Sequence, residues 1–389
     1  MKRLVVRSLQ AAAGCIVAAS LSSTEAGVVV YEEGDKKVEV GGRVQVQYLH
    51  TSPDGGESLD EIFLRRLRPY IQASVTKNWV GKIEFDFGEN LDSDEVEVKD
   101  AYMLWTKHED HRLFWGNSKT TFAREFLTSS TRLEFVERTF TGDHNFGTPD
   151  RMLGLRVDNA ALDERFTYQF SLGAEHHDPA FQRIDFDSPV SHEADWNEGV
   201  VVAARVGFDP RGHMPLQAAD FHTEEFKYGF GAGGYYWTND DDNNTYTDAA
   251  GNSLDPTRAD LDEASGYEVG FYLRGRGLSA DLAYQGIHGE TVATGFTGGL
   301  YLDGETDLDK TSVTVGYMLP TTTVEIVVGW DALDASNYQT TWTATIFGVN
   351  YYLDKHNLKV QGNYRMGSDV FGVSGDDIDT IQIQTQFVF

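Results

Sequence analysis

The sequence has little of what stabilises small secreted proteins or binds nucleic acid. It contains one cysteine, Cys15, and after residue 26 it has no run of 18 or more apolar residues. An ordinary transmembrane helix is therefore excluded as a route into a membrane. Lys and Arg number 32 against 61 Asp and Glu. Because nucleic acids are bound mainly through basic side chains, we expect no nucleic-acid partner.

The start of the chain has the pattern of a secretory signal peptide. Lys2, Arg3 and Arg7 make a short basic region, Leu9–Leu21 is a run of mostly small and apolar residues, and a small residue stands at Ala26. This pattern predicts export and cleavage after Ala26, so residues 1–26 are the expected signal peptide. A lipoprotein signal ending at Cys15 is the less favoured alternative, because its apolar stretch is short and interrupted.

Cleavage after Ala26 has consequences for the mature chain, residues 27–389. It removes Cys15, so no thiol, disulfide or thiolate metal site remains. It also removes three basic residues and one acidic residue, which leaves 29 basic against 60 acidic residues and a charge of −31. The acidity fits either a solvated surface or a cation-attracting function. We expect one domain over residues 27–389 and no cofactor or metal.

The last residues alternate between apolar and polar side chains. Ile381, Ile383 and Phe387 share one face with Phe389, and Gln382, Gln384 and Gln386 share the other. This is the period of a β-strand, and the length suits a tilted membrane crossing that ends on an interfacial aromatic residue. One face suits lipid and the other suits water.

The same alternation recurs along the chain and predicts an all-β protein, a transmembrane antiparallel β-barrel. The seventeen candidate strands are 38–48, 67–75, 83–87, 96–106, 112–117, 152–157, 166–174, 200–208, 226–237, 267–274, 278–286, 295–302, 311–318, 324–331, 342–352, 358–364 and 379–389. A barrel with both ends in the periplasm needs an even number, so one candidate must be wrong. We expect 16 strands, with 18 as the alternative. A soluble secreted β-protein would show similar alternation.

The connections between these candidates alternate in length. Short ones include 107–111, 159–164 and 354–357, whereas long ones include 51–62, 175–197 and 239–264. In the last, Asp240, Asp242, Asn244 and Asp248 have the spacing of calcium ligands, but the glycine and the terminal glutamate of such a loop are missing. We expect a solvated acidic extracellular loop.

The alternation fails between Asn117 and Met152. There Thr131–Glu134 has the form of a capping box, and Leu133, Val136 and Phe140 follow at helical spacing. We expect a long loop, residues 119–150, that contains a short helix and folds into the lumen to constrict it. A capping helix on the barrel surface is the alternative. The basic residues that the loop would present are Lys119, Arg124, Arg132 and Arg138.

Several motifs resemble those of a known family. They are Phe63–Arg68, Trp79–Phe87, Val98–Tyr102, Phe114–Phe122, Phe126–Ser130, Phe135–Arg138, Gly348–Leu353 and the closing strand. In these segments the chain resembles the phosphate-selective porins O and P, most strongly from Phe63 to Gly154.

This resemblance implies a homotrimer of sixteen-stranded barrels in the bacterial outer membrane, in contact with lipid and lipopolysaccharide. It also implies passive diffusion of small hydrophilic solutes, above all anions such as phosphate, along a path lined by basic residues. Arginine suits phosphate because its planar fork donates paired hydrogen bonds and keeps its charge. The candidate pore-lining residues are Arg43, Arg66, Arg68, Lys119, Arg124, Arg132 and Arg138.

Other functions remain to be separated from this one. A general or weakly cation-preferring porin would result if lumenal carboxylates outweighed the arginines, each of which can instead pair with a neighbouring acid. An outer-membrane hydrolase would need a nucleophile and a base close together. The sequence has no G-x-S-x-G or H-E-x-x-H motif, and we expect no enzymatic activity.

Overall fold

A computed structural model describes residues 27–88, 96–108, 110–159, 165–191, 199–239, 246–248 and 250–389. The predicted signal peptide lies outside these residues. The strands are β1 Val28–Glu33, β2 Lys36–Pro53, β3 Leu59–Thr76, β4 Trp79–Asp86, β5 Glu97–Trp105, β6 Arg112–Lys119, β7 Arg151–Asp158, β8 Phe166–Ala174, β9 His176–Asp178, β10 Asp185–Asp187, β11 Val200–Phe208, β12 Lys227–Thr238, β13 Leu261–Gly275, β14 Leu278–Thr291, β15 Glu305–Met318, β16 Val324–Ala335, β17 Trp342–Asp354, β18 Leu358–Ser368 and β19 Ile378–Val388.

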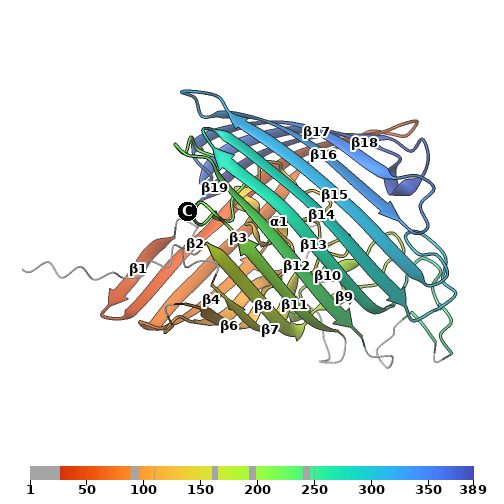
Figure 1. The fold of residues 1–389 in the computed structure, drawn as a ribbon, viewed down its shortest axis with the longest axis horizontal. Coiled ribbons are helices and arrows are strands. Elements are labelled where there is room, and N and C mark those ends of the chain that lie inside the picture. Colours follow the sequence, from red (N-terminus) through yellow and green to blue (C-terminus); the bar gives the residue numbers. More distant parts are fainter. Residues whose placement is uncertain are drawn as a thin grey trace, which may run out of the picture.

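Within the described residues, sixteen strands form a closed antiparallel ring, which is the sheet without β1 (Figure 1). Each strand pairs with the next along the chain, from β2 to β8 and from β11 to β19, and β8 pairs with β11. The ring closes where β19 pairs with β2, with Gln384 opposite Gln47. The short strand β1 pairs with β2 only beyond the end of β19. Closure leaves no strand edge of the ring without hydrogen bonds, as a lipid environment requires.

The alternation read from the sequence becomes the two faces of the wall. On β19, Ile381, Ile383 and Phe387 are exposed on the outside, whereas Gln384 and Gln386 are buried in the interior. The backbone of Phe389 pairs with Gly42 on β2, which fixes the last residue against the first strand of the ring. Apolar side chains outside and amides inside are the arrangement expected of a barrel in lipid.

The predicted fold is confirmed, with one candidate strand wrong. Residues 295–302 form turns in the connection between β14 and β15. Leu300 and Tyr301 are fully buried there, in a cluster with Phe296 and residues of the inner wall. The backbone N–H of Leu300 donates to Phe181 of another connection. These apolar side chains therefore pack inside the barrel rather than against lipid, which periodicity alone did not distinguish.

The helix predicted from Thr131 to Phe140 is wrong. The described residues instead contain one α-helical turn, α1 (Arg124–Leu127), and the 3₁₀ turns η1 (Ser130–Arg132), η2 (Pro189–Ser191) and η4 (Val370–Gly372). After η1 the chain is irregular, and wall side chains bind its backbone groups. Residues 120–150, between β6 and β7, are called the inward segment from here on.

The remaining connections bear on two expectations. Among the described residues no helix is long and apolar enough to cross a membrane. In the acidic connection after β12, Asp240, Asp242 and Asn244 lie outside the described residues. Asp248 accepts hydrogen bonds from the N–H groups of Ala250 and Asn252, so it serves as a turn residue. No group of three or more potential metal ligands occurs in the described part of the chain.

The outward face of β19 provides a test of the membrane embedding. Ile383 lies at the middle of the strand and is 46% exposed. Ile383→Lys should destabilise the folded protein in phospholipid vesicles by about 2–4 kcal/mol, the cost of a lysine at the bilayer midplane. Equilibrium unfolding in urea, followed by tryptophan fluorescence, measures the difference. Asp379→Lys, at the end of the same face, is the matched control and should change stability far less; equal effects would contradict the embedding.

Candidate functional site: the charged lumen

The inward segment lies inside the ring and is held by side chains of the inner wall. On one side of the ring, Arg43 of β2 donates to the hydroxyls of Ser129 and Ser130, both at 3.1 Å. On another side, Gln285 of β14 donates to the carbonyl of Thr141 at 2.6 Å. β2 and β14 lie far apart around the ring (Figure 1), so side chains from distant strands bind the same segment.

Most of these wall side chains bind backbone groups of the inward segment. The pairs are Gln386 with the carbonyl of Thr131, Lys359 with that of Leu133, Asn350 and Gln361 with that of Glu134, Asn363 with the N–H of Val136, and Lys310 with the carbonyl of Phe146. Lys310 and Lys359 are fully buried. An irregular segment cannot satisfy its own backbone, so the wall supplies the donors that a helix would have supplied internally.

Three of the candidate residues, Arg43, Arg66 and Arg68, lie on β2 and β3 and face the interior. Arg43 forms an ion pair with Glu84 at 2.7 Å, and Arg68 forms one with Asp86 at 2.6 Å. Arg66 donates to the side chain of Gln45 at 3.0 Å and lies 3.3 Å from Glu137 of the inward segment. Each arginine of this group is therefore paired with a carboxylate.

Lys119 and Arg138 are arranged differently. Lys119 donates to the carbonyls of Phe126 and Thr128, at 2.5 and 3.1 Å, and Arg138 donates to the same two at 3.4 and 2.9 Å. Within the described residues neither forms an ion pair with a carboxylate. Their positive charges are thus left uncompensated by direct partners.

Arg124 and Arg132 lie nearer the other side of the lumen. The guanidinium of Arg124 stacks 4.1 Å from the ring centre of Tyr272 and donates to the carbonyl of Pro215 at 2.9 Å. The carbonyl of Arg132 accepts from the N–H of Ala218 at 3.0 Å. The structure therefore does not bring these two into the group formed by Arg43, Arg66 and Arg68.

Sequence reasoning missed several basic residues of the lumen. Arg65 is the extra residue of a bulge between β2 and β3, and it binds Glu137 at 2.6 Å. Strict alternation would place Arg65 on the lipid side, because it ignores the bulge. Three more cations belong to this group because each forms an ion pair with an acid. The pairs are Lys82 with Asp100, Lys99 with Glu97 and Arg151 with Asp150. Alternation along β4 was a signal for Lys82, since its neighbours Ile83 and Phe85 are exposed on the outside. It gave no signal for Lys99, the extra residue of an irregularity between β4 and β5, or for Arg151, which shares its parity with the exposed Leu153.

The resulting basic cluster has more cations than carboxylates. Its nine cations are Arg43, Arg65, Arg66, Arg68, Lys82, Lys99, Lys119, Arg138 and Arg151, and its six carboxylates are Glu84, Asp86, Glu97, Asp100, Glu137 and Asp150. Counted over the described residues, the excess is three positive charges while Glu125, which lies near Arg138, is neutral, and two when Glu125 is ionised. The Nε groups of Arg66 and Arg138 are buried and have no hydrogen-bond acceptor there. An oxyanion is the ligand that such donors bind best.

The acids of the inward segment differ in protonation. Burial alone would raise the pKa of Glu137, but the charges of Arg65 and Arg66 outweigh it and lower the pKa to about 2. Burial raises the pKa of Glu125 to about 7, even though Thr139 donates to its carboxylate through both the backbone and the hydroxyl. Burial lowers the pKa of Arg138 to about 10. Arg138 therefore stays charged near neutral pH, where Glu125 titrates.

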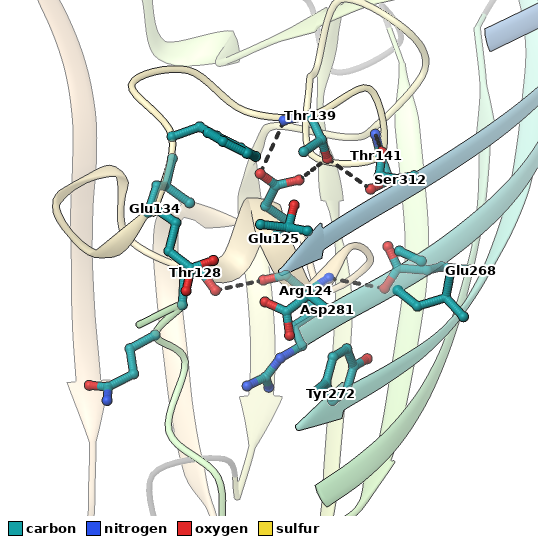
Figure 2. A pocket seen from close by; sticks show the side chains of 17 residues that line it. Arg124, Glu125, Thr128, Glu134, Thr139, Thr141, Glu268, Tyr272, Asp281 and Ser312 are labelled. Carbon is teal, nitrogen blue, oxygen red and sulfur yellow. Dashed lines mark hydrogen bonds between the residues drawn. The ribbon is translucent and has the colours of Figure 1, made fainter. Parts of the chain in front are cut away.

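A pocket of about 50 Å³ lies between the inward segment and strands β13 to β15. Figure 2 shows Arg124 and Tyr272 at one end of it and Thr139, Thr141 and Ser312 at the other. Its charged lining is one guanidinium, Arg124, and four carboxyl groups, those of Glu125, Glu134, Glu268 and Asp281. This side of the lumen is thus more acidic than the basic cluster.

The titration of Glu125 predicts a pH dependence of ion selectivity. A carboxyl group with a raised pKa is neutral below that pKa and negative above it, so raising the pH through about 7 adds a negative charge near Arg138. The anion preference of the open pore should therefore fall as the pH rises through this value. Reversal potentials in a salt gradient across a planar bilayer measure it. In Glu125→Gln the step should disappear; a step that persists unchanged would assign it to another group.

Comparisons with known proteins agree with this geometry. Residues 38–182 match the family model described as phosphate-selective porin O and P. No curated protein matches the chain by sequence. The trimer form of OmpT, an outer membrane protein of Vibrio cholerae, is 13% identical with a TM-score of 0.56, over 92% of this chain and 100% of that one.

Two further solved structures share the fold. The anion-selective porin from Comamonas acidovorans is 10% identical with a TM-score of 0.59, over 91% of this chain and 100% of that one. The outer membrane channel DcaP of Acinetobacter baumannii is 12% identical with a TM-score of 0.55, over 93% of this chain and 100% of that one. The described chain thus has the fold of an outer-membrane porin, and its resemblance to the phosphate-selective porin O and P family is confirmed over residues 38–182.

Proposed function

We propose that this protein is a passive, water-filled channel of the outer membrane that prefers small anions, phosphate among them. The observation that carries the proposal is the excess of cations over carboxylates, counted over the described residues, in the basic cluster beside the inward segment. In this proposal residues 119–150 form the constriction. The candidate pore-lining residues are Arg43, Arg65, Arg66, Arg68, Lys119 and Arg138. Arg124 lies at the pocket instead, and Arg132 lies next to Ala218.

The strongly negative chain, with a formal charge of −29, does not by itself favour cations in the pore. Charges separated by more than about 8–10 Å are largely screened at physiological ionic strength. Acidic residues in the outer connections therefore act weakly on an ion at the inward segment. The cluster acts at contact distance and in a confined space, where its fields are stronger.

Phosphate selectivity is supported by the donor chemistry of the cluster and by the family match. Arg66 and Arg138 each keep one buried N–H without an acceptor among the described residues. Most other guanidinium groups of the cluster are already paired with carboxylates, so a passing anion meets weak partial sites rather than one tight site. Conduction with selectivity requires such weak, multiple sites.

A double substitution tests the proposal. Lys119→Gln with Arg138→Gln lowers the excess charge of the cluster by two. A charge at 4 Å is worth about 1 kcal/mol even in bulk water, which corresponds to about fivefold in ion partitioning. The anion-to-cation permeability ratio, obtained from reversal potentials in a chloride salt gradient, should fall by about that factor or more. Phosphate should also block the chloride current less.

The matched control keeps the charge and changes the donor geometry. Arg138→Lys should preserve the chloride preference but weaken the block by phosphate, because an ammonium group lacks the planar fork. Cation selectivity of the unmodified protein would overturn the anion proposal in favour of a general, weakly cation-preferring porin. Anion selectivity without any block by phosphate would contradict phosphate selectivity but leave the anion preference standing.

The export and assembly of the protein are part of the same proposal. We propose that residues 1–26 are removed, that the barrel forms a homotrimer, and that its outer surface contacts membrane lipid and lipopolysaccharide. The trimer is supported by the trimer form of OmpT, which shares the fold. Lipid contact is supported by the large apolar side chains exposed around the wall, such as Trp115, Phe170, Trp330 and Phe347.

Processing can be checked directly on protein recovered from outer membranes. Intact mass and N-terminal sequencing should place the first residue at Gly27. Because Cys15 is the only cysteine, the mature protein should not react with a maleimide even when unfolded. A lipid-modified chain that begins at Cys15 would instead show the lipoprotein alternative to be correct.

A further inference from the structure

One connection at the tight-turn end of the barrel is unlike its neighbours. There β13 and β14 are joined by Arg276–Gly277 alone, and β17 and β18 by Lys355–Asn357. Residues 209–226, between β11 and β12, are far longer and turn back into the ring. Met214 is 2% exposed and Ala219 is fully buried. We call residues 209–226 the strap.

The strap is anchored to the wall across part of the opening. The carboxylate of Asp220 accepts from the N–H of Gly277 at 2.6 Å, and Arg274 of β13 donates to the carbonyl of Gln217 at 2.9 Å. Further around the ring, the ring of Phe221 packs edge-on against Tyr352 of β17, with centroids 5.0 Å apart. It packs in the same way against His356, at 5.2 Å. The strap therefore extends from β11 to the turn after β17.

The strap also touches the inward segment directly. The N–H of Ala218 donates to the carbonyl of Arg132 at 3.0 Å, and Arg124 donates to the carbonyl of Pro215 at 2.9 Å. Gln217 and Ala218 complete the lining of the pocket shown in Figure 2, with Arg124 and Glu134 of the inward segment. The inward segment is thus held by the wall around it and by the strap at its tight-turn side.

The stretch that the strap contacts, residues 124–132, also carries the carbonyls that bind the two uncompensated cations. Lys119 and Arg138 both donate to Phe126 and Thr128. Displacing this stretch would displace those two side chains, although the strap touches neither of them. Such an indirect effect makes the strap a positioning element.

We propose that the strap positions residues 124–132 and thereby fixes Lys119 and Arg138 at the constriction. The expected effect of the strap on ion flow rests on the proposed anion preference of the basic cluster. The expected effect of the strap on the structure of the inward segment does not. The competing reading is that the strap only fills the opening, in which case loosening it would leave the inward segment unchanged.

Two strap variants and one control separate these readings. In the first variant, residues 211–225 are replaced by a short Gly-Ser turn, which β11 and β12 permit because their ends are paired at Phe208 and Phe230. In the second, Phe221→Ala removes the ring that packs against Tyr352 and His356. Glu225→Gln is the control, because Glu225 is exposed and does not line the pocket.

The first readout is a thiol probe that does not depend on ion selectivity. Leu127→Cys introduces the only thiol of the mature chain at a side chain that is 7% exposed. With the strap intact, a water-soluble thiol reagent should modify it slowly. Both strap variants should speed the modification several-fold, and Glu225→Gln should not. An unchanged rate in both variants, with the barrel still heat-modifiable and folded, overturns the proposal.

The second readout is the reversal potential of the same variants without the probe. Both strap variants should lower the anion-to-cation permeability ratio toward that of the Lys119→Gln, Arg138→Gln protein. If the unmodified protein prefers cations, the proposed function fails, and the thiol rates still decide on the strap. Faster thiol modification with an unchanged permeability ratio would overturn the link from the strap to Lys119 and Arg138.

Discussion

The structure depends on one constraint, the need to pair every backbone N–H and C=O group where water is scarce. In lipid this need is met by closure of the sheet, which the pairing of β19 with β2 completes. Inside the ring the same need is met by side chains, because the inward segment is irregular. Lys359 and Lys310 donate to the carbonyls of Leu133 and Phe146, so buried ammonium groups take the place of backbone donors.

This arrangement explains why charge is distributed so unevenly in the protein. Burying a charged side chain is costly unless hydrogen bonds or an opposite charge compensate it. On β2 to β7 the compensation comes mostly from carboxylates, as in the pair of Arg43 and Glu84. For Lys119 and Arg138 it comes from the carbonyls of the inward segment. Carbonyl dipoles stabilise the cations without cancelling their charge, so among the described residues the basic cluster keeps an excess of cations in a chain of net charge −29.

The sequence predicted the parts of the site that follow a regular period. Arg43, Arg66 and Arg68 face the interior, in the direction that alternation indicates along β2 and along β3 after the bulge at Arg65. Arg65 was missed because a bulge changes the direction of its side chain. The helix after Thr131 was wrong because helical spacing also occurs among apolar residues that pack separately, as Phe140 does against Phe146 and against Leu333 of the wall. Residues 295–302 looked like a strand for a similar reason, since Phe296, Leu300 and Tyr301 are apolar but buried inside the barrel.

By itself the sequence determined the closed β-barrel, because a period of two along β-strands states which face meets lipid and which meets water, and it determined the number of strands to within one. Only the tertiary structure decided where the irregular connections lie and which cations remain uncompensated. The physical reason is that these features depend on contacts between residues distant in the chain, such as Gln386 with Thr131 and Ala218 with Arg132. No local sequence pattern indicates which wall side chain hydrogen-bonds to which carbonyl of the inward segment in the closed ring.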